Sequence, residues 1–262
     1  MKTLVITGGS SGIGRAAAEI FAGHGYRVFE LSRHGGDLPG ITHIGTDISD
    51  ESSVRAAFKA VSEETEKIDL LICNAGFGIS GAIEFTELCD AKRQFDVNLF
   101  GAFMTVKYAL PLVKKARGRI MFCSSAAAVF SIPFQGFYSA SKAALNSLSA
   151  ALKNELKGFG VSVCSLQFGD TATGFTAARE SSTAGNDRYK GAISKSVAVM
   201  EKDEKNGMSS KDAAAFVFRI SKKKRVRPVY TVGAKYRLFC FANRLLPASL
   251  VNFAIGKMYI PK

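Results

Sequence analysis

Short apolar runs, each separated from the next by a helical pattern, constrain the fold of this chain most strongly. Strands that are apolar along their whole length are typical of a parallel sheet covered by helices on both faces. Right-handed crossovers between such strands give a doubly wound α/β fold, which binds ligands at the carboxyl ends of its strands. The sequence predicts seven strands, at 2–7, 26–31, 41–46, 68–73, 119–123, 161–166 and 228–232, and helices at 13–23, 50–66, 84–95, 99–116 and 137–157.

The length and composition fit one folded unit. The chain has 262 residues, 47% of them apolar, and lacks linkers and repeats, so residues 1–262 are expected to form one domain. Residues 171–209 interrupt the alternation of strands and helices and are expected to form a substrate lid. The start of the chain stops being apolar too early for a signal peptide. The five cysteines lie far apart without metal-ligand spacing, which favours reduced thiols, no metal site and a cytoplasmic protein.

The net charge of +13 is concentrated near the C-terminus. No acidic residue follows Asp212, whereas eleven lysines and arginines do, so residues 1–212 are close to neutral. The basic, apolar segment 222–262 is interrupted by Pro247 and allows two interpretations. It forms a final helix that covers the sheet and the substrate cleft, or it contacts an anionic membrane surface. Nucleic-acid binding is disfavoured, because no aromatic residues are interleaved with an exposed basic groove.

A glycine-rich stretch, Thr-Gly-Gly-Ser-Ser-Gly-Ile-Gly at 7–14, joins the first strand to the first helix. Glycine allows a positive φ and a close approach of the backbone to a pyrophosphate, and a helix N-terminus offers free N–H groups to an anion. The spacing differs from the commonest dinucleotide motif. The residues expected at the phosphates are Gly8, Ser10, Ser11, Gly12, Ile13 and Gly14.

This spacing resembles that of the short-chain dehydrogenase/reductase family, and later motifs follow in the family's order along nearly the whole chain. The resemblance implies a Rossmann-like three-layer sandwich and hydride transfer between a nicotinamide cofactor and a ketone or secondary alcohol. The sequence is similar to NADP-preferring members such as hydroxysteroid and retinol dehydrogenases and carbonyl reductases. Such relatives commonly form dimers or tetramers through the two helices here placed at 99–116 and 137–157.

The second strand ends in a residue that favours NADP(H). An NAD enzyme carries an acidic residue near this point for the ribose hydroxyl, but this chain has Ser32 and Arg33. A guanidinium pairs with a 2′-phosphate through two hydrogen bonds, whereas a carboxylate repels it. Arg15 is a second candidate for this role, and Asp37 keeps NAD as the minority alternative.

Further cofactor contacts follow from the resemblance. Asp47 and Ile48 match the family's adenine contact, and Asn74, Ala75 and Gly76 match its Asn-Ala-Gly turn; either group could instead be structural. After the sixth strand, the chain departs from the family because Phe168 stands where proline is usual and Thr171 replaces an aliphatic residue. Since Gly169 and Thr173 remain, cofactor binding is expected to survive, while the carboxamide contacts are in doubt.

Tyr138 and Lys142 are four residues apart on the predicted helix 137–157 and therefore share a face. A nearby cation lowers the pKa of a phenol, which suits proton transfer to a carbonyl oxygen. Ser125 precedes Tyr138 by the separation usual in the family and would orient the substrate oxygen, with Ser124 as the alternative. Asn98 matches the family's fourth catalytic position, where an asparagine near a helix irregularity holds a water.

The substrate pocket is expected to be built from segments flanking these residues. Gln135, Phe168 and Phe175, together with Ser125 and Tyr138, are predicted to contact a lipophilic substrate, steroid-like or long-chain. Phe130, Phe134 and Phe137 are further candidates, although several of these rings could fill the core. The rival hypotheses are a catalytically silent NADP(H) sensor or scaffold and, less favoured for this length, a sugar-nucleotide epimerase.

Overall fold

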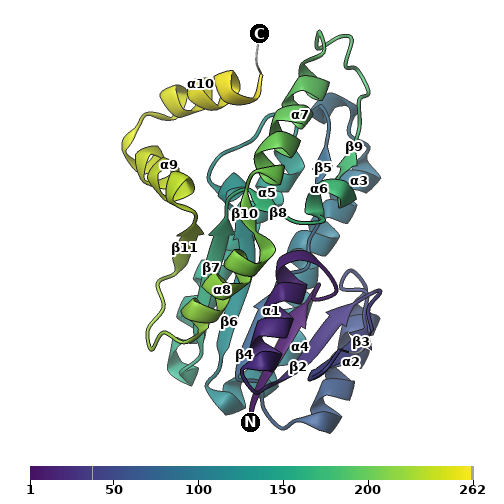
Figure 1. Ribbon diagram of the computed structural model, residues 1–262, viewed down its shortest axis with the longest axis vertical. Helices are drawn as coiled ribbons and strands as arrows, with labels where there is room; N and C mark the ends of the chain where they lie inside the picture. The colour runs from purple at the N-terminus through teal and green to yellow at the C-terminus, as the bar shows by residue number, and fades with distance from the viewer. Residues whose placement is uncertain (37, 261–262) are drawn as a thin grey trace.

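The computed structural model describes residues 1–36 and 38–260. Seven parallel strands form the central sheet in the order β11-β7-β6-β4-β1-β2-β3, so the predicted doubly wound, three-layer fold is confirmed (Figure 1). The order reverses between β1 and β4, which opens the crevice in which such folds bind ligands. The strands are β1 Lys2–Thr7, β2 Tyr26–Ser32, β3 Ile41–Gly45, β4 Leu70–Cys73, β6 Arg119–Ser125, β7 Ser162–Phe168 and β11 Val229–Val232.

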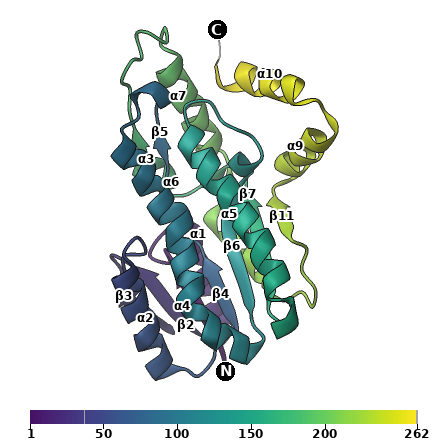
Figure 2. The ribbon, with the colours of Figure 1, turned by 180° about the vertical axis from the view of Figure 1, so that it is seen from behind.

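Helices cover both faces of the sheet. The helices α1 Gly12–Gly23 and α8 Ser210–Ser221 pack together on the face seen in Figure 1. The opposite face, seen in Figure 2, carries α2 Glu51–Glu64, α4 Gly101–Ala116 and α5 Gly136–Glu155. Because both faces are covered, nearly every residue of β1, β4 and β7 is buried, which explains their continuous apolar sequences.

Helix boundaries differ from the predictions in two places. The predicted helix 84–95 is a 3₁₀ turn, Ile83–Phe85, followed by α3 Leu88–Phe95, because the intervening Thr86 and Glu87 have extended backbone. The predicted helix at 99–116 is preceded by a π-helical turn, Asp96–Phe100, that links α3 to α4 without a break. The start of α2 is as predicted, since the carboxylate of Asp50 accepts from the backbone N–H of Ser52.

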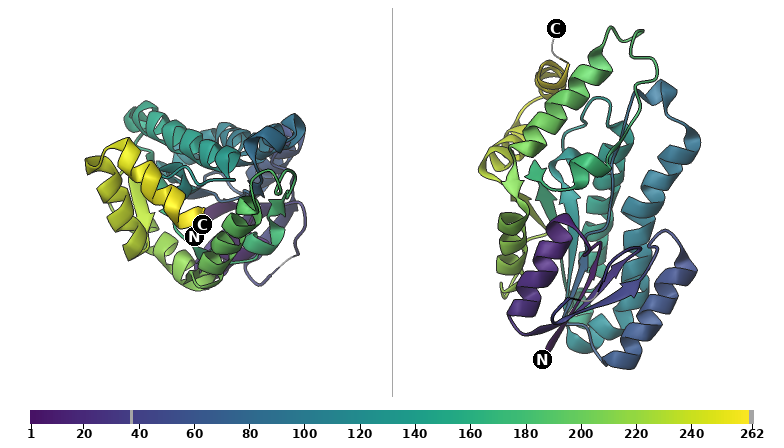
Figure 3. Two further views of the ribbon diagram at one scale, coloured as in Figure 1. Left: turned by 90° about the horizontal axis from the view of Figure 1, so that it is seen from above. Right: turned by 45° about the vertical axis from the view of Figure 1, so that its right-hand side comes forward.

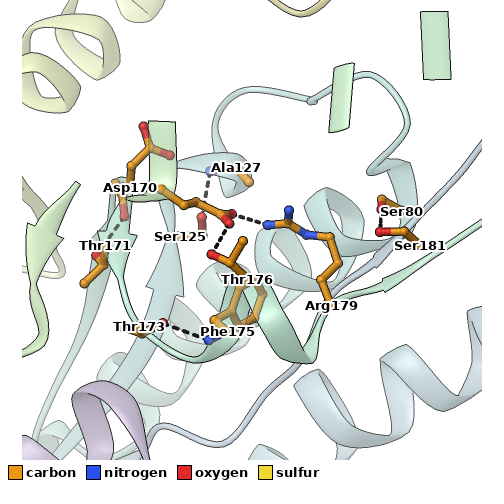
Figure 4. Close-up of polar contacts among 12 residues, drawn as sticks. Ser80, Ser125, Ala127, Asp170, Thr171, Thr173, Phe175, Thr176, Arg179 and Ser181 are labelled. Atoms are coloured by element: carbon orange, nitrogen blue, oxygen red, sulfur yellow. Dashed lines mark hydrogen bonds and ion pairs between the residues drawn. The ribbon is translucent and has the colours of Figure 1, made fainter. Parts of the chain in front are cut away.

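The segment 171–209 rises above the carboxyl edge of the sheet (Figure 3). It contains β8 Thr171–Ala172, α6 Phe175–Ala178, β9 Glu180–Ser181, α7 Ala192–Lys205 and β10 Met208–Ser209. Two short parallel pairs hold it: β8 with β10 inside the segment, and β9 with β5 Ile79–Ser80 from the loop after β4. The second pair is strengthened by a hydrogen bond of 2.9 Å between the hydroxyls of Ser80 and Ser181, drawn in Figure 4.

Two helices follow β11, the edge strand of the sheet. They are α9 Ala234–Leu245 and α10 Ala248–Tyr259, and Pro247 separates them as predicted (Figure 3). Smaller 3₁₀ turns lie at Ala126–Ala128 and Lys157–Phe159. Among the described residues, no helix has the length and apolar character needed to cross a membrane.

Candidate active site

A cavity of about 790 Å³ opens at the carboxyl ends of the strands. Its walls come from the glycine turn, the ends of β2, β4, β6 and β7, the segment 171–209 and the helices α9 and α10. The structure brings most of the predicted site residues together on this cavity: Gly8, Ser10, Ser11, Gly12, Ile13, Ser32, Arg33, Asp47, Ile48, Asn74, Ala75, Gly76, Ser125, Gln135, Tyr138, Lys142, Phe168, Gly169, Thr171, Thr173 and Phe175.

The glycine turn is shaped by close backbone contacts. Gly8 has φ +65°, and a Cβ there would lie 2.9 Å from the Cα of Ala75. A Cβ on Gly14 would lie 2.1 Å from the carbonyl oxygen of Gly8, so Gly14 allows helix and turn to pack instead of lining the cavity. Ser11 makes no side-chain cap at the start of α1, and the first turn carries no acid, so its N–H groups are open to an anion.

A buried carboxylate beneath this turn was missed by the sequence analysis. Glu30, on β2, accepts a hydrogen bond of 2.9 Å from the backbone N–H of Gly9 and contacts Nδ1 of His43 at 2.5 Å. A Cβ on Gly9 would approach the Glu30 side chain to 2.4 Å. Glu30 therefore supports the turn from the sheet side; only its position inside an otherwise apolar strand could have drawn attention to it.

Arg33 and Arg15, the two candidate partners of a 2′-phosphate on the cofactor, lie in different surroundings. Arg33 lines the cavity, and the hydroxyl of the neighbouring Ser32 donates to the carbonyl of His34. Arg15 is directed elsewhere, because its Nε pairs with Glu19 one turn along α1 at 2.9 Å. Asp37 lies outside the described residues.

The neighbouring side chains are held in place by short local hydrogen bonds. Asp47 accepts from the backbone N–H and the hydroxyl of Ser49 at 2.9 and 2.6 Å, and these bonds, mainly that of the hydroxyl, lower the pKa of its carboxyl. The amide Nδ2 of Asn74 donates to the carbonyls of Thr7 and Gly8 at 3.1 and 3.0 Å. Asn74 thus ties the end of β4 to the glycine turn. Together these features fit a bound nicotinamide dinucleotide.

The predicted reacting side chains meet near the middle of the cavity. Ser125 ends β6 and Tyr138 lies in the first turn of α5. The phenol is half-buried, and burial raises the pKa of Tyr138 to about 12, although a hydrogen bond with Ser125 acts in the opposite direction. The other serine, Ser124, is turned to α5, where its hydroxyl donates to the carbonyl of Lys142. Ser125 is therefore the partner of the phenol.

Lys142 is buried, with only 5% of its surface exposed. Its Nζ donates to the carbonyl of Cys123 at 3.1 Å and lies 5.8 Å from the centre of the Tyr138 ring. Burial lowers the pKa of this ammonium group to about 8. The predicted lowering of the Tyr138 pKa by Lys142 is not found: burial raises this pKa, and the groups that act in the opposite direction are Ser125 and Arg179.

Asn98 lies in the π-helical turn between α3 and α4, the irregularity that the resemblance implied. It is completely buried, and its Oδ1 accepts from the backbone N–H of Phe77 at 3.0 Å while its Nδ2 donates to the hydroxyl of Ser141 at 3.1 Å. A Cβ on Gly76 would lie 3.0 Å from Asn98 Oδ1 and 3.2 Å from Lys142 Nζ. Asn98 therefore adjoins Lys142 behind the cavity wall.

The substrate end of the cavity is mostly apolar. Phe130, Phe168 and Phe175 line it, and the Phe175 ring lies 5.7 Å from that of Tyr138. Phe134 instead packs against Tyr189 in the segment 171–209. The inner sides of α9 and α10 were not predicted to line the cavity residue by residue, although their apolar spacing of three and four is a usable signal. They contribute Tyr236, Phe239, Ala242, Asn243, Leu250, Val251, Ala254, Ile255, Met258 and Tyr259.

A doubly wound sheet with a dinucleotide-shaped turn and a serine–tyrosine–lysine group at its switch point defines an oxidoreductase of the nicotinamide-dependent class. The family model described as short chain dehydrogenase matches residues 2–184. This chain belongs to the short-chain dehydrogenase family.

Individual relatives match this chain over nearly its whole length. The sequence is 35% identical to a 3-ketodihydrosphingosine reductase from Bacteroides thetaiotaomicron, over 98% of both proteins. Among solved structures, a short-chain dehydrogenase from Streptomyces avermitilis superposes with a TM-score of 0.83 at 22% identity, covering 98% of this chain and 96% of that one. Another from Burkholderia phymatum, in complex with NAD, has a TM-score of 0.80 at 24% identity and covers 93% and 92%. These structural likenesses concern the fold.

Proposed function

We propose that the protein reduces the ketone group of a long-chain lipid with NADPH. The observation that carries this proposal is the position of Ser125 and Tyr138, which face one cavity whose substrate end is lined mainly by apolar side chains, many of them from α9 and α10. A cavity of this kind binds a lipophilic molecule and positions it through few polar groups. The similarity to a 3-ketodihydrosphingosine reductase supports a long-chain ketone over a steroid.

The side chains divide the chemistry among them. The nicotinamide supplies the hydride when bound, so that a ketone, NADPH and one proton become an alcohol and NADP⁺. Tyr138 donates its phenolic proton to the carbonyl oxygen, and Ser125 donates a hydrogen bond that stabilises the developing oxyanion. Because its pKa is raised to about 12, the phenol is protonated at neutral pH and has a proton to donate. Lys142 supplies positive charge beside them.

The preference for NADPH rests on Arg33. Its side chain lines the cavity at the end of β2, where a guanidinium can pair with a 2′-phosphate. Arg15, the other candidate, is engaged by Glu19. Gly8, Gly12 and Ser11 would hold the pyrophosphate, while Asp47 and Ile48 would contact the adenine.

A panel of ketones tests this function directly. The purified protein would be assayed with NADPH and with NADH against 3-ketodihydrosphingosine, a simple long-chain ketone and a 3-ketosteroid. We expect turnover of the long-chain ketones, faster with NADPH. Cofactor binding without turnover of any ketone would identify a sensor, and turnover of the steroid alone would overturn the long-chain assignment.

We further propose that the outer surface of α9 and α10 contacts an anionic lipid bilayer. Phe241 and Phe253 are each 60% exposed, and Leu238 and Leu245 are exposed beside them. The charged residues of these two helices are all basic and all exposed, namely Lys235, Arg237, Arg244 and Lys257. Apolar groups combined with positive charge match the chemistry of an anionic membrane surface. A lipid substrate could then enter the cavity from the bilayer.

Vesicle flotation checks this contact. The protein is expected to float with vesicles of phosphatidylcholine and phosphatidylserine and much less with phosphatidylcholine alone. The double variant Phe241→Ser/Phe253→Ser should lose flotation, whereas Leu88→Ser, which removes an exposed apolar residue far along the chain, should keep it. A second copy of the chain as occupant would instead appear as a concentration-dependent dimer that the double variant abolishes.

The proposal includes a cytoplasmic homodimer or homotetramer. All five thiols are free, as is usual in a reducing compartment. Phe100 and Phe103 are exposed at the start of α4, one of the two helices expected to form the subunit contact. Light scattering of the purified protein measures the oligomeric state, and substitution of Phe103 by serine should shift it towards monomer.

A further inference from the structure

The apolar substrate end of the cavity contains a carboxylate that the proposed chemistry does not use. Glu204 lies near the end of α7 and lines the cavity. It is close enough to Tyr138 for its negative charge to raise the pKa of the phenol. A carboxylate in apolar surroundings is costly unless it is paired, so its surroundings indicate its role.

Glu204 is held by Thr176 on α6 and by Arg179 just after it. Its Oε1 accepts from Nη2 of Arg179, and its Oε2 accepts from the hydroxyl of Thr176 at 2.6 Å, bonds shown as dashed lines in Figure 4. Each carboxylate oxygen can accept a second hydrogen bond. Since 15% of the Glu204 side chain remains exposed, this capacity is open to a ligand in the cavity.

Arg179 is bound to Glu204 with its own donors incompletely used. Its side chain is 1% exposed, and its Nε and Nη1 are buried without a hydrogen-bond partner among the described residues. The guanidinium of Arg179 therefore holds the carboxylate of Glu204 in one position, although two of its own nitrogens make no hydrogen bond. Breaking such a pair leaves an unpaired buried charge, so the arrangement is rigid.

A second polar group faces the same cavity. Gln135 precedes α5, is 4% exposed and lines the cavity, and its amide Nε2 has no hydrogen-bond partner within the described part of the chain. Buried amide donors are normally satisfied, so an unpartnered one on a cavity wall points to a group of the ligand. Gln135 offers a donor, and Glu204 offers an acceptor that carries charge.

The other charged groups near this wall are already engaged. Arg93 pairs with Glu180 and Asp90, and Asp170 accepts from the phenol of Tyr236. Of the carboxylates that line the cavity, Glu204 is the one whose charge raises the pKa of Tyr138, so it is the carboxylate beside the reacting side chains.

We infer that Glu204 and Gln135 form a head-group site for a ketone that carries an ammonium group on the neighbouring carbon and a hydroxyl beyond it. The ammonium group donates to Glu204, the hydroxyl accepts from Gln135, and the carbonyl oxygen lies between Ser125 and Tyr138. The hydrocarbon chain of the same molecule extends along α9 and α10. This inference rests on the proposed reduction of long-chain ketones and specifies the class as long-chain amino ketones.

The competing interpretation is structural, with Arg179 and Glu204 serving only to hold the lid. The two interpretations differ in what they predict for a pair of substrates. A structural role affects all ketones alike, whereas a head-group site affects only those that carry the ammonium group.

The test compares kcat/KM for 3-ketodihydrosphingosine with that for a plain ketone of equal chain length. Because a charge-assisted hydrogen bond is made to only one of them, the protein is expected to prefer the amino ketone by roughly tenfold to a hundredfold. Glu204→Gln keeps the shape of the side chain and should reduce this preference to about threefold or less. Glu201→Gln removes the same charge from the same helix outside the cavity and should keep the preference.

A change in the substrate gives an independent result if Glu204→Gln does not fold. N-acetylation removes the positive charge of the amino ketone, and the unaltered protein should then lose the same preference. A folded Glu204→Gln variant with the original preference, or an acetylated substrate reduced as well as the free amine, would overturn the head-group site alone. No reduction of either ketone with NADPH or NADH would overturn the proposed function, and this inference with it.

Discussion

The two ends of the cavity are built by different means. The cofactor end is made of strand ends and one glycine turn, where single atoms decide the fit: a Cβ on Gly14 would lie 2.1 Å from a backbone oxygen. The substrate end is made of a lid and two late helices, whose outer apolar residues are widely exposed. At the first end the backbone gives the site most of its shape, and at the second end side chains do.

This difference separates chemistry from substrate choice. Ser125 lies at the end of β6, and Tyr138 and Lys142 lie on α5. Both elements pack into the hydrophobic core. Glu204 lies on α7 and Phe175 on α6, both in the segment 171–209 above the sheet. Substitutions at the sheet end should therefore affect all substrates, while those at the lid end should discriminate between them.

The largest expected effect is at Tyr138. Tyr138→Phe removes the proton donor, and loss of a general acid costs about 10² to 10⁴ in rate. Turnover of every ketone should fall by that factor, while NADPH binding measured by fluorescence stays close to that of the unaltered protein. Tyr230→Phe, a change on β11, serves as control. A Tyr138→Phe variant with normal turnover would remove the phenol from the mechanism.

Ser125 and Ser124 provide a sharper comparison between neighbouring positions. Ser125→Ala removes a donor to the developing oxyanion, which typically costs about 10² to 10³ in kcat. Ser124→Ala removes only a hydrogen bond to the Lys142 carbonyl and should cost much less. Steady-state kinetics of both variants would decide the assignment, and a larger loss for Ser124→Ala would reverse it.

The sequence was most informative at the cofactor end. Gly8 and Gly14 could be recognised because a turn that meets a pyrophosphate tolerates few residue types. All seven strands were predicted from apolar runs. Glu204 could not be found in this way, because a carboxylate on an isolated amphipathic helix looks like a solvated residue. Its importance becomes visible only in the folded structure, where α6 and α7 bring Arg179 and Thr176 to it.

A smaller effect is expected at Arg33, where the adenosine ribose of the cofactor would lie. Arg33→Asp replaces the candidate partner of the 2′-phosphate with a repelling charge. The ratio of kcat/KM with NADPH to that with NADH should fall by roughly tenfold to a hundredfold, the value of one or two charged hydrogen bonds. Arg15→Asp should leave the ratio close to its original value, since Arg15 pairs with Glu19. An unchanged ratio for Arg33→Asp would remove its role as selector.

The smallest expected effect is a pH dependence of the reduction rate that arises from Lys142. Lys142 has a pKa of about 8, so its charged fraction falls as the pH rises from 7 to 9. Tyr138, with a pKa of about 12, stays protonated over this range. Reduction should therefore slow about tenfold between pH 7 and pH 9, as the lysine loses its proton. The plain ketone carries no amine that loses a proton in this range, so its limb reports on Lys142 alone, and a rate independent of pH for the plain ketone would contradict the requirement for charged Lys142.

The position of α9 and α10 after the edge strand β11 has a consequence for biosynthesis. A ribosome makes all seven strands before it makes these two helices, so the part of the cavity wall that they supply is synthesised last, after an interval. At usual elongation rates the interval is on the order of seconds. Until the two helices pack, the apolar side chains that they cover face water, and a chaperone or an early encounter with lipid would protect them from aggregation.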